Sequence, residues 1–199
     1  APLNLYGATK LAAEKLVLSA NMYKGSSNAK FLVVRYGNVA GSKGSVIPLF
    51  KEMIKKKQTL TITDKKMTRF NLSLLDSCRF VYKILKFKNI EGVYVPKLKS
   101  YNILDIASVI SKENKIKLIG IRPGEKIHEV MITKDESLYT LEFSDHFLIA
   151  PSYVIVKNFI KKYKLKLKIK KSFHNKDYSS DSVKRFSINE LKKIISDIT

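Results

Sequence analysis

A short, nearly continuous apolar run, Phe31 to Tyr36 (FLVVRY), places the strongest constraint on the fold of this chain. It follows a stretch from Leu5 to Tyr23 in which apolar residues recur at helical spacing, and it precedes a glycine-rich loop at 37–45 (GNVAGSKGS). A run of this length between turn residues is typical of a buried strand in a parallel sheet. The order amphipathic helix, strand and glycine-rich loop therefore predicts an α/β protein.

Helical and strand patterns continue to alternate along the chain. The spacing predicts helices over 47–56, 74–87 and 103–110, and strands over 60–63, 92–96 and 116–121. A sharp turn at Arg122-Pro-Gly124 opens the segment EKIHEVMI. Ser187, with Glu190 three residues later, predicts a capping box at the start of a last helix over 187–198.

The chain is strongly basic, with 38 Lys and Arg against 17 Asp and Glu and a net charge of +21. Lysines account for 33 of the 38, whereas phosphate and base recognition favours the bidentate guanidinium. The excess therefore favours a solvated surface. A polyanion-binding module is the alternative, resting on the nine lysines between Lys157 and Lys176. Strict alternation at 164–170 predicts an edge strand with one wet face.

Cysteine and histidine are scarce. The single Cys78 cannot form an intramolecular disulfide, and no Cys/His cluster has metal-ligand spacing, so we expect a reducing compartment, the cytoplasm, and no metal site. No run reaches the roughly 18 apolar residues of a membrane span, so no membrane partner is expected. Cys78 is predicted to lie in the core, and His146 and His174 to face solvent.

Tyr6 and Lys10, in Tyr6-Gly-Ala-Thr-Lys10, are the strongest local signal for chemistry. A spacing of four places both side chains on one helix face. An ammonium beside a phenol favours the phenolate, which would let tyrosine act as a base near neutral pH. Such a pair can take a proton from an alcohol while its hydride leaves. By itself the pattern also fits an ordinary exposed helix.

Four strings, NLYGATKLAAEKL, VVRYGNVAGSKGSVIPLF, LTITDKKMTRF and IGIRPGEKIHEVMI, together are more specific. They resemble the extended short-chain dehydrogenase/reductases, and within these the inverting UDP-N-acetylglucosamine 4,6-dehydratases of the polysaccharide biosynthesis group. The resemblance spans residues 1 to about 150. It implies the second half of a Rossmann-type doubly wound parallel sheet plus a small α/β substrate-binding region. It also implies a nucleotide-sugar lyase on the route to pseudaminic acid, used in flagellin or surface polysaccharide glycosylation.

The resemblance assigns a catalytic and cofactor-binding group and divides the chain. Tyr6 would be the base and Lys10 its electrostatic partner, with Lys10 also holding the nicotinamide ribose, while Tyr36 and Val39 would face the nicotinamide of NAD or NADP. Residues 1–96 would form the later part of the NAD(P)-binding domain, residues 97–156 the nucleotide-sugar region, and residues 157–199 a lysine-rich segment and C-terminal helix.

The resemblance also assigns the substrate site. Asn38 would contact UDP-N-acetylglucosamine near its diphosphate, Arg69 and Arg122 would clamp the diphosphate, and Glu125 would lie near the uridine ribose. Arginine and carboxylate groups suit phosphate and ribose hydroxyls respectively. Ordinary structural interpretations remain open: Arg69 as a surface ion-pair partner, Asn38 as a turn residue, and residues 41–44 as a linker.

A dinucleotide-binding GxGxxG turn does not occur in the sequence. We therefore expect the chain to be the C-terminal part of a longer enzyme and to be inactive on its own. We also expect the full-length enzyme to be a homo-oligomer and to have no nucleic-acid partner. A nucleotide-sugar epimerase of the same superfamily is the alternative enzyme, since it uses the same Tyr/Lys chemistry without elimination.

Overall fold

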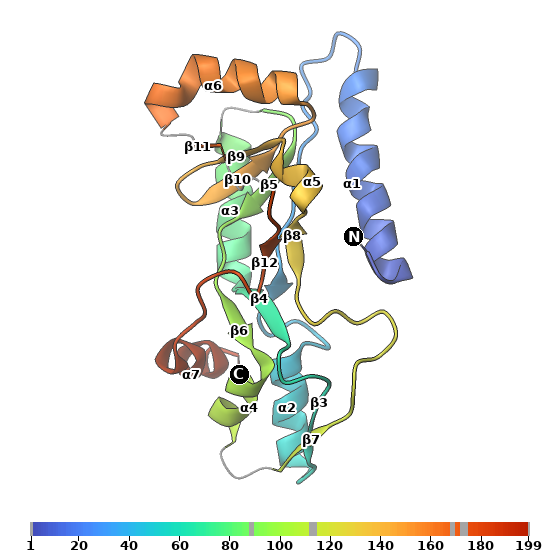
Figure 1. Cartoon of the computed structure of the whole chain (residues 1–199), viewed down its shortest axis with the longest axis vertical. Helices are drawn as coiled ribbons and strands as arrows, with labels where there is room; N and C mark the ends of the chain where they lie inside the picture. Colours follow the sequence, from blue (N-terminus) through green and yellow to red (C-terminus); the bar gives the residue numbers. More distant parts are fainter. Residues whose placement is uncertain (1, 88–89, 112–114, 168–169, 172–174, 199) are drawn as a thin grey trace. The chain divides into compact units, whose positions relative to one another are not determined.

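The computed structural model of the chain describes residues 2–87, 90–111, 115–167, 170–171 and 175–198 (Figure 1). The chain forms two compact units, each assembled from three separate stretches. Unit 1 comprises residues 1–36, 78–97 and 130–178, and unit 2 comprises residues 37–77, 98–129 and 179–199. These units do not coincide with the three consecutive regions predicted from the resemblance, 1–96, 97–156 and 157–199. The functions assigned to those regions stay predictions.

Unit 1 is built on a mixed five-stranded sheet of order β1-β5-β10-β9-β11. β1 and β5 are parallel, with Val33 opposite Val93, and the other three pairs are antiparallel. The strands are β1 (Val33–Val34), β5 (Val93–Pro96), β9 (Thr140–Glu142), β10 (His146–Ile149) and β11 (Lys170–Lys171), with a further short strand, β8 (Val130–Ile132). The helices are α1 (Leu5–Tyr23), α3 (Leu74–Lys86, from residue 78 onward), α5 (Lys134–Ser137) and α6 (Tyr153–Leu167).

The core of unit 1 lies where α3 and α6 pack on the sheet. Phe80 and Ile84 come from α3 and Val156 from α6, and they meet buried residues of β5, β9 and β10 and the residues that follow them. Those are Tyr94, Leu141, Phe143, Leu148 and Ala150. Helix packing over the sheet thus supplies the hydrophobic stabilisation of this unit.

Unit 2 contains two small sheets. In the first, β2 (Asn38–Val39) pairs parallel with β4 (Thr68–Leu72), which pairs antiparallel with β6 (Ser100–Asn102). In the second, β3 (Leu60–Ile62) pairs parallel with β7 (Ile116–Leu118). The helices are α2 (Val46–Lys55), α4 (Ile103–Ile110) and α7 (Ile188–Ser196), and β12 (Tyr178–Ser179) spans the boundary of the two units.

The core of unit 2 joins its three helices to both sheets. Its buried members are Ile47, Phe50, Leu60, Ile62, Met67, Tyr101, Ile103, Ile106, Ala107, Leu191 and Ile195. The last two come from α7, which begins at the predicted Ser187 N-cap with the predicted Glu190 capping box. Helix α7 therefore completes a core whose first member is residue 47.

The sequence predicted the positions of most helices correctly. The predictions over 5–23, 47–56, 74–87, 103–110 and 187–198 correspond to α1, α2, α3, α4 and α7, and the α/β class is confirmed. The predicted strands over 60–63, 92–96 and 116–121 correspond to β3, β5 and β7. The buried strand at 31–36 is shorter and less buried than expected, because only Val33 and Val34 pair and both are half-buried.

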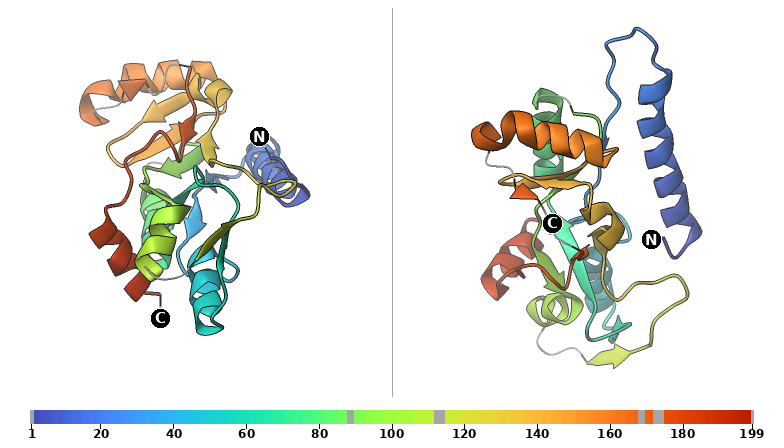
Figure 2. Two further views of the ribbon diagram at one scale, coloured as in Figure 1. Left: turned by 60° about the horizontal axis from the view of Figure 1, so that its bottom comes forward. Right: turned by 45° about the horizontal axis from the view of Figure 1, so that its top comes forward.

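Helix α1 differs from the amphipathic helix predicted for it. Leu16 is 72% exposed and Leu11 38%, and Glu14 is the buried residue of the helix. The right view of Figure 2 shows α1, in blue, standing beside the β1 segment with most of its length uncovered. Polar contacts hold this helix to unit 1: Glu14 pairs with Arg35 at 2.6 Å, and the Asn21 side chain exchanges two hydrogen bonds with the Phe31 backbone.

Three predictions about individual segments were wrong. Within the described part of the alternating stretch 164–170, residues 164–167 are helical in α6, and Lys170 opens the short strand β11 (Lys170–Lys171) at the edge of the sheet. Cys78 is exposed, because α3 buries the face that carries Phe80 and Ile84. His146 is 1% exposed within a group of aromatic rings. His174 lies outside the described residues.

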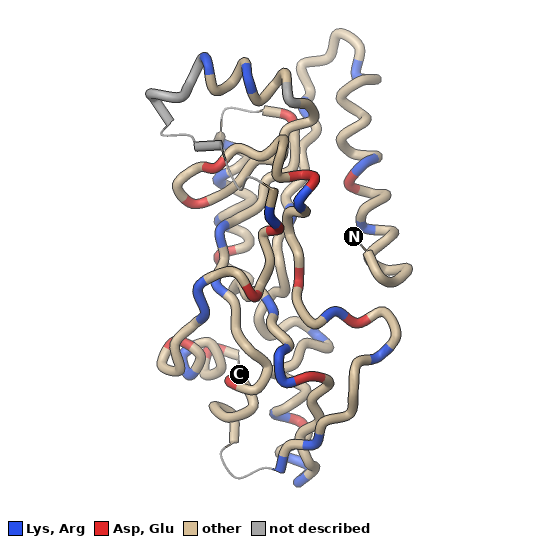
Figure 3. Tube along the Cα trace, in the orientation of Figure 1, with Lys and Arg blue, Asp and Glu red and all other residues tan. Residues whose placement is uncertain are grey.

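Charged residues are spread over both units. Figure 3 shows lysine and arginine on many elements, with acidic residues between them. Much of the lysine-rich stretch after Lys157 falls where side chains are not described, so the proposed polyanion site stays a prediction. Among the described helices, none combines the length and apolar character needed to cross a membrane.

Candidate functional site

A pocket of about 420 Å³ in unit 2 is the principal candidate site. Its walls come from the glycine-rich loop after β2, the first turns of α2, the strands β3 and β4, and the turn that begins at Arg122. Apolar side chains such as Phe50 and Met67 lie beside hydroxyl, amide and guanidinium groups. Apolar walls with a few polar groups are typical of small-molecule sites.

All the residues predicted to bind the substrate line this one pocket. They are Asn38, Arg69, Arg122 and Glu125, and Val39 from the predicted cofactor group lines it as well. They come from three separate parts of the sequence, and no local pattern requires them to meet. Their convergence is the main geometric finding of the site, although it does not by itself establish their roles.

The approach of β2 to β4 explains why the loop begins with a glycine. A Cβ atom on Gly37 would lie 2.6 Å from Cβ of Phe70, closer than two carbon atoms can pack. Asn38 pairs with Asn71 in the parallel register that follows. Gly37 is thus required by a close backbone approach, and it places Asn38 at the wall of the pocket.

Arg69 is largely buried, with 15% of its side chain exposed, and it is not the surface ion-pair partner considered above. Its Nη1 donates to the carbonyls of Thr68 and Ile127 at 2.7 and 2.9 Å, and Nη2 donates to that of Lys126 at 2.7 Å. Because these bonds join β4 to the segment 126–127, Arg69 anchors the wall of the pocket in addition to lining it.

Arg122 and Glu125 form a compact turn. The Glu125 amide donates to the Arg122 carbonyl at 3.0 Å, and the Arg122 amide donates to the Glu125 carboxylate at 3.2 Å. The two side chains predicted to bind diphosphate and ribose are therefore placed by the same short loop.

Glu129 was missed by the sequence analysis. Its Oε1 accepts a hydrogen bond from Asn38 Nδ2 and its Oε2 accepts one from the Phe70 amide, both at 2.8 Å. Burial raises the pKa of Glu129 above its usual range, although Arg69 and these hydrogen bonds act in the opposite direction. Glu129 lies in the string EKIHEVMI, but its partner Asn38 is 91 residues away, so spacing could not reveal the contact.

A buried polar network supports the segment that carries Glu129. Thr68 Oγ1 lies 2.8 Å from His128 Nδ1 and 2.7 Å from Ser180 Oγ, and the Glu129 amide donates to Ser180 Oγ at 2.9 Å. Thr68 and Ser180 are fully buried. This network gives a structural role to His128 and Ser180, residues from two distant segments.

The predicted catalytic pair lies in unit 1, on the first turns of α1. Asn4 caps the helix by accepting from the Gly7 amide at 2.8 Å, and Lys10 Nζ lies 5.4 Å from the centre of the Tyr6 ring. Tyr6 is 73% exposed. The two side chains therefore share a face that is open to a ligand. Tyr36, also exposed, follows β1 at the end of the same stretch of unit 1.

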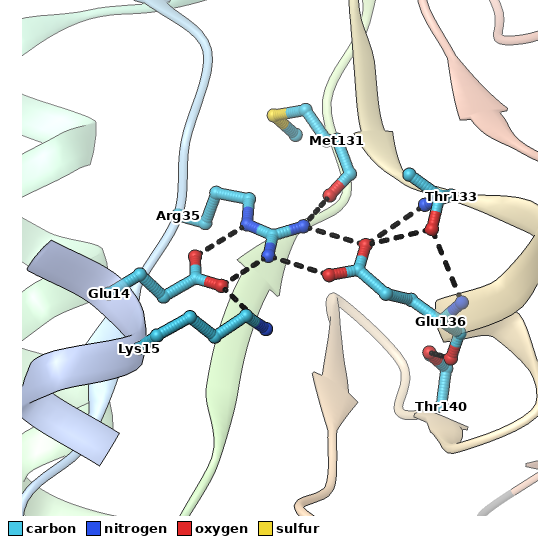
Figure 4. A network of polar contacts seen from close by, with 7 residues as sticks. All are labelled: Glu14, Lys15, Arg35, Met131, Thr133, Glu136 and Thr140. Carbon is cyan, nitrogen blue, oxygen red and sulfur yellow. Dashed lines mark hydrogen bonds and ion pairs between the residues drawn. The ribbon is translucent and has the colours of Figure 1, made fainter. Parts of the chain in front are cut away.

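Arg35 fixes the helix that carries this pair (Figure 4). It donates to both carboxylate oxygens of Glu14 at 2.6 and 2.9 Å, to both of Glu136 at 2.8 and 2.9 Å, and to the Met131 carbonyl at 2.6 Å. All five N–H groups are used. Burial alone would lower the pKa of Arg35, but Glu136 and Glu14 raise it, so the guanidinium is charged.

The chain belongs to the family described as polysaccharide biosynthesis protein, whose pattern matches residues 1–151. It is 46% identical over 158 residues to a UDP-N-acetylglucosamine 4,6-dehydratase (inverting) of Campylobacter jejuni, an alignment covering 78% of this chain and 47% of the relative. It is 34% identical to a UDP-glucose 4-epimerase of Rickettsia rickettsii, covering 98% of this chain and 57% of the relative. The chain thus spans about half the length of the curated relatives it matches.

Solved structures show the same fold. Pen from Bacillus thuringiensis is 36% identical, with a TM-score of 0.81 over the whole of this chain and 59% of that protein. A UDP-glucuronic acid 4-epimerase mutant from Bacillus cereus, solved with a UDP-sugar analogue and NAD, is 27% identical, with a TM-score of 0.54 over 64% of this chain and 43% of that protein. The α/β architecture is therefore that of the Rossmann-type nucleotide-sugar enzymes.

Proposed function

We propose that this chain carries the Tyr/Lys pair and the nucleotide-sugar pocket of an inverting UDP-N-acetylglucosamine 4,6-dehydratase. The observation that carries the proposal is the convergence of Asn38, Arg69, Arg122 and Glu125 on one pocket. In the proposed complex Arg122 and the exposed edge of Arg69 face the diphosphate, and Glu125 accepts from ribose hydroxyls. The likeness to the Campylobacter jejuni dehydratase supports the choice of sugar.

The residues of unit 1 suit proton transfer beside a nicotinamide cofactor. Tyr6 and Lys10 share an exposed helix face, and hydroxyl and ammonium groups match the hydroxyls of a ribose. We therefore propose that Lys10, Tyr6 and Tyr36 of unit 1 contact NAD or NADP. Val39 lines the pocket of unit 2, and its contact with the nicotinamide stays a prediction from the resemblance. The bound cofactor supplies the acceptor for the C4 hydride. Tyr6 removes the proton of the C4 hydroxyl, with the Lys10 ammonium beside it on the same helix face.

We place this reaction in the cytoplasm, at the start of a route to pseudaminic acid. We expect the enzyme to be a homo-oligomer, with neither nucleic acid nor a membrane as partner.

The later steps of the proposed reaction follow from the oxidation at C4. The C4 ketone acidifies the C5 hydrogen, so that water can leave from C5 and C6. The hydride taken from C4 would then be returned to C6 as C5 takes up a proton, so that the overall reaction is redox-neutral, and inversion at C5 depends on the face that is protonated.

The first test is binding to the 199-residue chain. Calorimetry with UDP-N-acetylglucosamine should show binding that Arg122→Ala weakens at least tenfold, because a charge-assisted contact to phosphate contributes about 1.5–3 kcal/mol. Arg79→Ala is the matched control, since Arg79 is exposed on α3 of unit 1. Equal binding by the Arg122 variant and the control would contradict the assignment of the pocket.

The second test is turnover. A chimera would join the part of the Campylobacter jejuni dehydratase that precedes its matching segment to this chain. Mass spectrometry should show a UDP-sugar product lighter by one water, and Tyr6→Phe should abolish it. A product of unchanged mass would favour the epimerase, whose support is the 98% coverage of this chain by the Rickettsia rickettsii relative. No conversion by the chimera, with binding intact, would contradict both enzymes.

A further inference from the structure

We propose that Glu129 is a positioning residue that orients the Asn38 amide, so that Asn38 accepts a hydrogen bond through Oδ1 from the sugar part of the nucleotide sugar. This inference rests on the proposed function. The contact predicted from the resemblance placed Asn38 near the diphosphate. The inference names the sugar as the group that Asn38 contacts, gives the direction of the hydrogen bond, and identifies Glu129 as the residue that determines this direction.

The two oxygens of Glu129 have separate donors. Oε2 accepts from the backbone amide of Phe70 at 2.8 Å. Phe70 lies within β4, paired with Ser100 of β6, so this amide cannot turn away. Oε1 accepts from Asn38 Nδ2 at 2.8 Å. The hydrogen bond from the Phe70 amide fixes the position of the Glu129 carboxylate. The carboxylate then determines whether the nitrogen or the oxygen of the Asn38 side-chain amide faces it.

Asn38 Nδ2 faces the carboxylate and donates to it, as suits an ionised carboxylate, whose oxygens are acceptors only. The amide is planar, and Oδ1 then points to the other side. Asn38 lines the pocket and is exposed. Within the described part of the chain, no residue donates to Asn38 Oδ1. Asn38 therefore presents an acceptor to a ligand in the pocket.

An acceptor at this position discriminates between parts of the ligand. The oxygens of an ionised diphosphate are acceptors, and they cannot bond to Oδ1. The ligand's donors are the hydroxyls and acetamido N–H of the sugar, the ribose hydroxyls and the uracil N–H. The ribose hydroxyls are assigned to Glu125, and comparison with UDP, which carries ribose and uracil but no sugar ring, separates the sugar donors from the others. Arg69 and Lys126 place positive charge near Glu129, with Arg69 Nε 3.8 Å from Oε1, and they compensate part of the burial of the carboxylate.

The test uses the nearly isosteric variant Glu129→Gln in the 199-residue chain. The carbonyl of the introduced glutamine must accept from the Phe70 amide, so its NH₂ faces Asn38 and turns the Asn38 amide around. Asn38 would then present a donor to the ligand. We expect affinity for UDP-N-acetylglucosamine to fall about tenfold relative to the affinity for UDP, the value of one hydrogen bond, because loss of the Glu129 charge acts alike on the diphosphate of both ligands.

The double variant Asn38→Asp with Glu129→Gln is the rescue. The NH₂ of the introduced glutamine can donate to one oxygen of the introduced aspartate, leaving the other oxygen as an acceptor toward the pocket, and the total charge of the pair is retained. We expect it to recover most of the lost affinity. Glu52→Gln, on an exposed carboxylate of α2, is the control. In the free protein, NMR should show the Asn38 side-chain amide moving upfield in Glu129→Gln.

The remaining outcomes separate the two proposals. Equal loss of UDP and UDP-sugar binding in Glu129→Gln would show a general structural role and overturn the inference. An equal gain in affinity for UDP and for the UDP-sugar would overturn it as well, because it would show an effect on the shared diphosphate alone. If neither ligand binds the wild-type chain, the proposed function fails, and the inference fails with it.

Discussion

The Arg35 clamp makes a quantitative prediction about helix α1. Arg35→Met removes all five hydrogen bonds and leaves the carboxylates of Glu14 and Glu136 with the exposed Lys15, 3.6 Å from Glu14 Oε1, as a neighbouring cation. Their side chains are only 8% and 20% exposed. Breaking a buried ion pair by removing one partner costs about 3–5 kcal/mol, and the partial exposure here favours the lower end.

Local opening of α1 should report this loss. Glu14 is the buried residue of the helix, so α1 has little apolar packing to hold it once the clamp is broken. About 3 kcal/mol corresponds to a roughly 100-fold increase in the open population. Hydrogen exchange measured by mass spectrometry should show that increase in peptides from 5–23, while peptides from the core of unit 1 change less.

Two further variants serve as controls for this prediction. Arg79→Met changes an exposed arginine of the same unit and should leave α1 exchange unaltered. Replacing Glu14 and Glu136 by Gln together with Arg35→Met removes the unpaired charges and should restore much of the protection. Unchanged exchange of α1 in Arg35→Met would refute the conclusion that the ion pair, and not apolar contact, holds the helix.

The same clamp has a defined pH dependence. Burial opposes ionisation of Glu136, but Arg35 and the Thr133 amide lower its pKa below the usual value. A lowered pKa in the folded state stabilises the fold above the unfolded pKa, and that stabilisation is lost as pH falls through the folded pKa. Protection of α1, corrected for intrinsic exchange, should therefore decline below about pH 4.5, and the triple variant should not show that decline.

Two further predictions concern the cores. Gly37→Ala places a Cβ 2.6 Å from Phe70 Cβ, so the free energy of unfolding should fall by about 1–3 kcal/mol, whereas Gly25→Ala, with free space around it but a positive φ, should act only through backbone strain. His146 is buried with Nε2 unpaired in the described structure, and burial lowers its pKa, so stability should fall as pH drops below about 6.5. His146→Phe should remove that slope in thermal unfolding; an unchanged slope would assign it to another group.

Local periodicity was enough to locate the regular elements of this chain. The apolar spacing in 103–110 and the capping box at Ser187 depend on neighbours within one or two turns, and both appear as predicted. Strands β4 and β6 were missed, because they pair with each other across a long stretch of sequence and their residues mix polar and apolar types. Strand β10 was also missed, although its partner β9 comes shortly before it in the chain. The alternating lysines at 164–167 were misread, because leucine and lysine also form helices readily.

The residues of the candidate site also fall into two groups, those predicted from the sequence and those found only in the structure. Resemblance to a family identified Asn38, Arg69, Arg122 and Glu125, and the fold brings them to one pocket. The residues that hold them in place, Glu129 and the Thr68 network, act through contacts between distant segments, so no pattern in the sequence marks them. Residue type can suggest what touches a ligand, whereas only tertiary structure shows what supports it.

The interleaving of the two units governs the order in which this protein can fold during synthesis. The chain passes between the units after residues 36, 77, 97, 129 and 178, so neither unit exists as one continuous stretch. Leu191 and Ile195 belong to the core of unit 2, and they leave the ribosome after every other member of that core. Loss of α7 would therefore open the core of unit 2, although it removes no residue of the pocket itself.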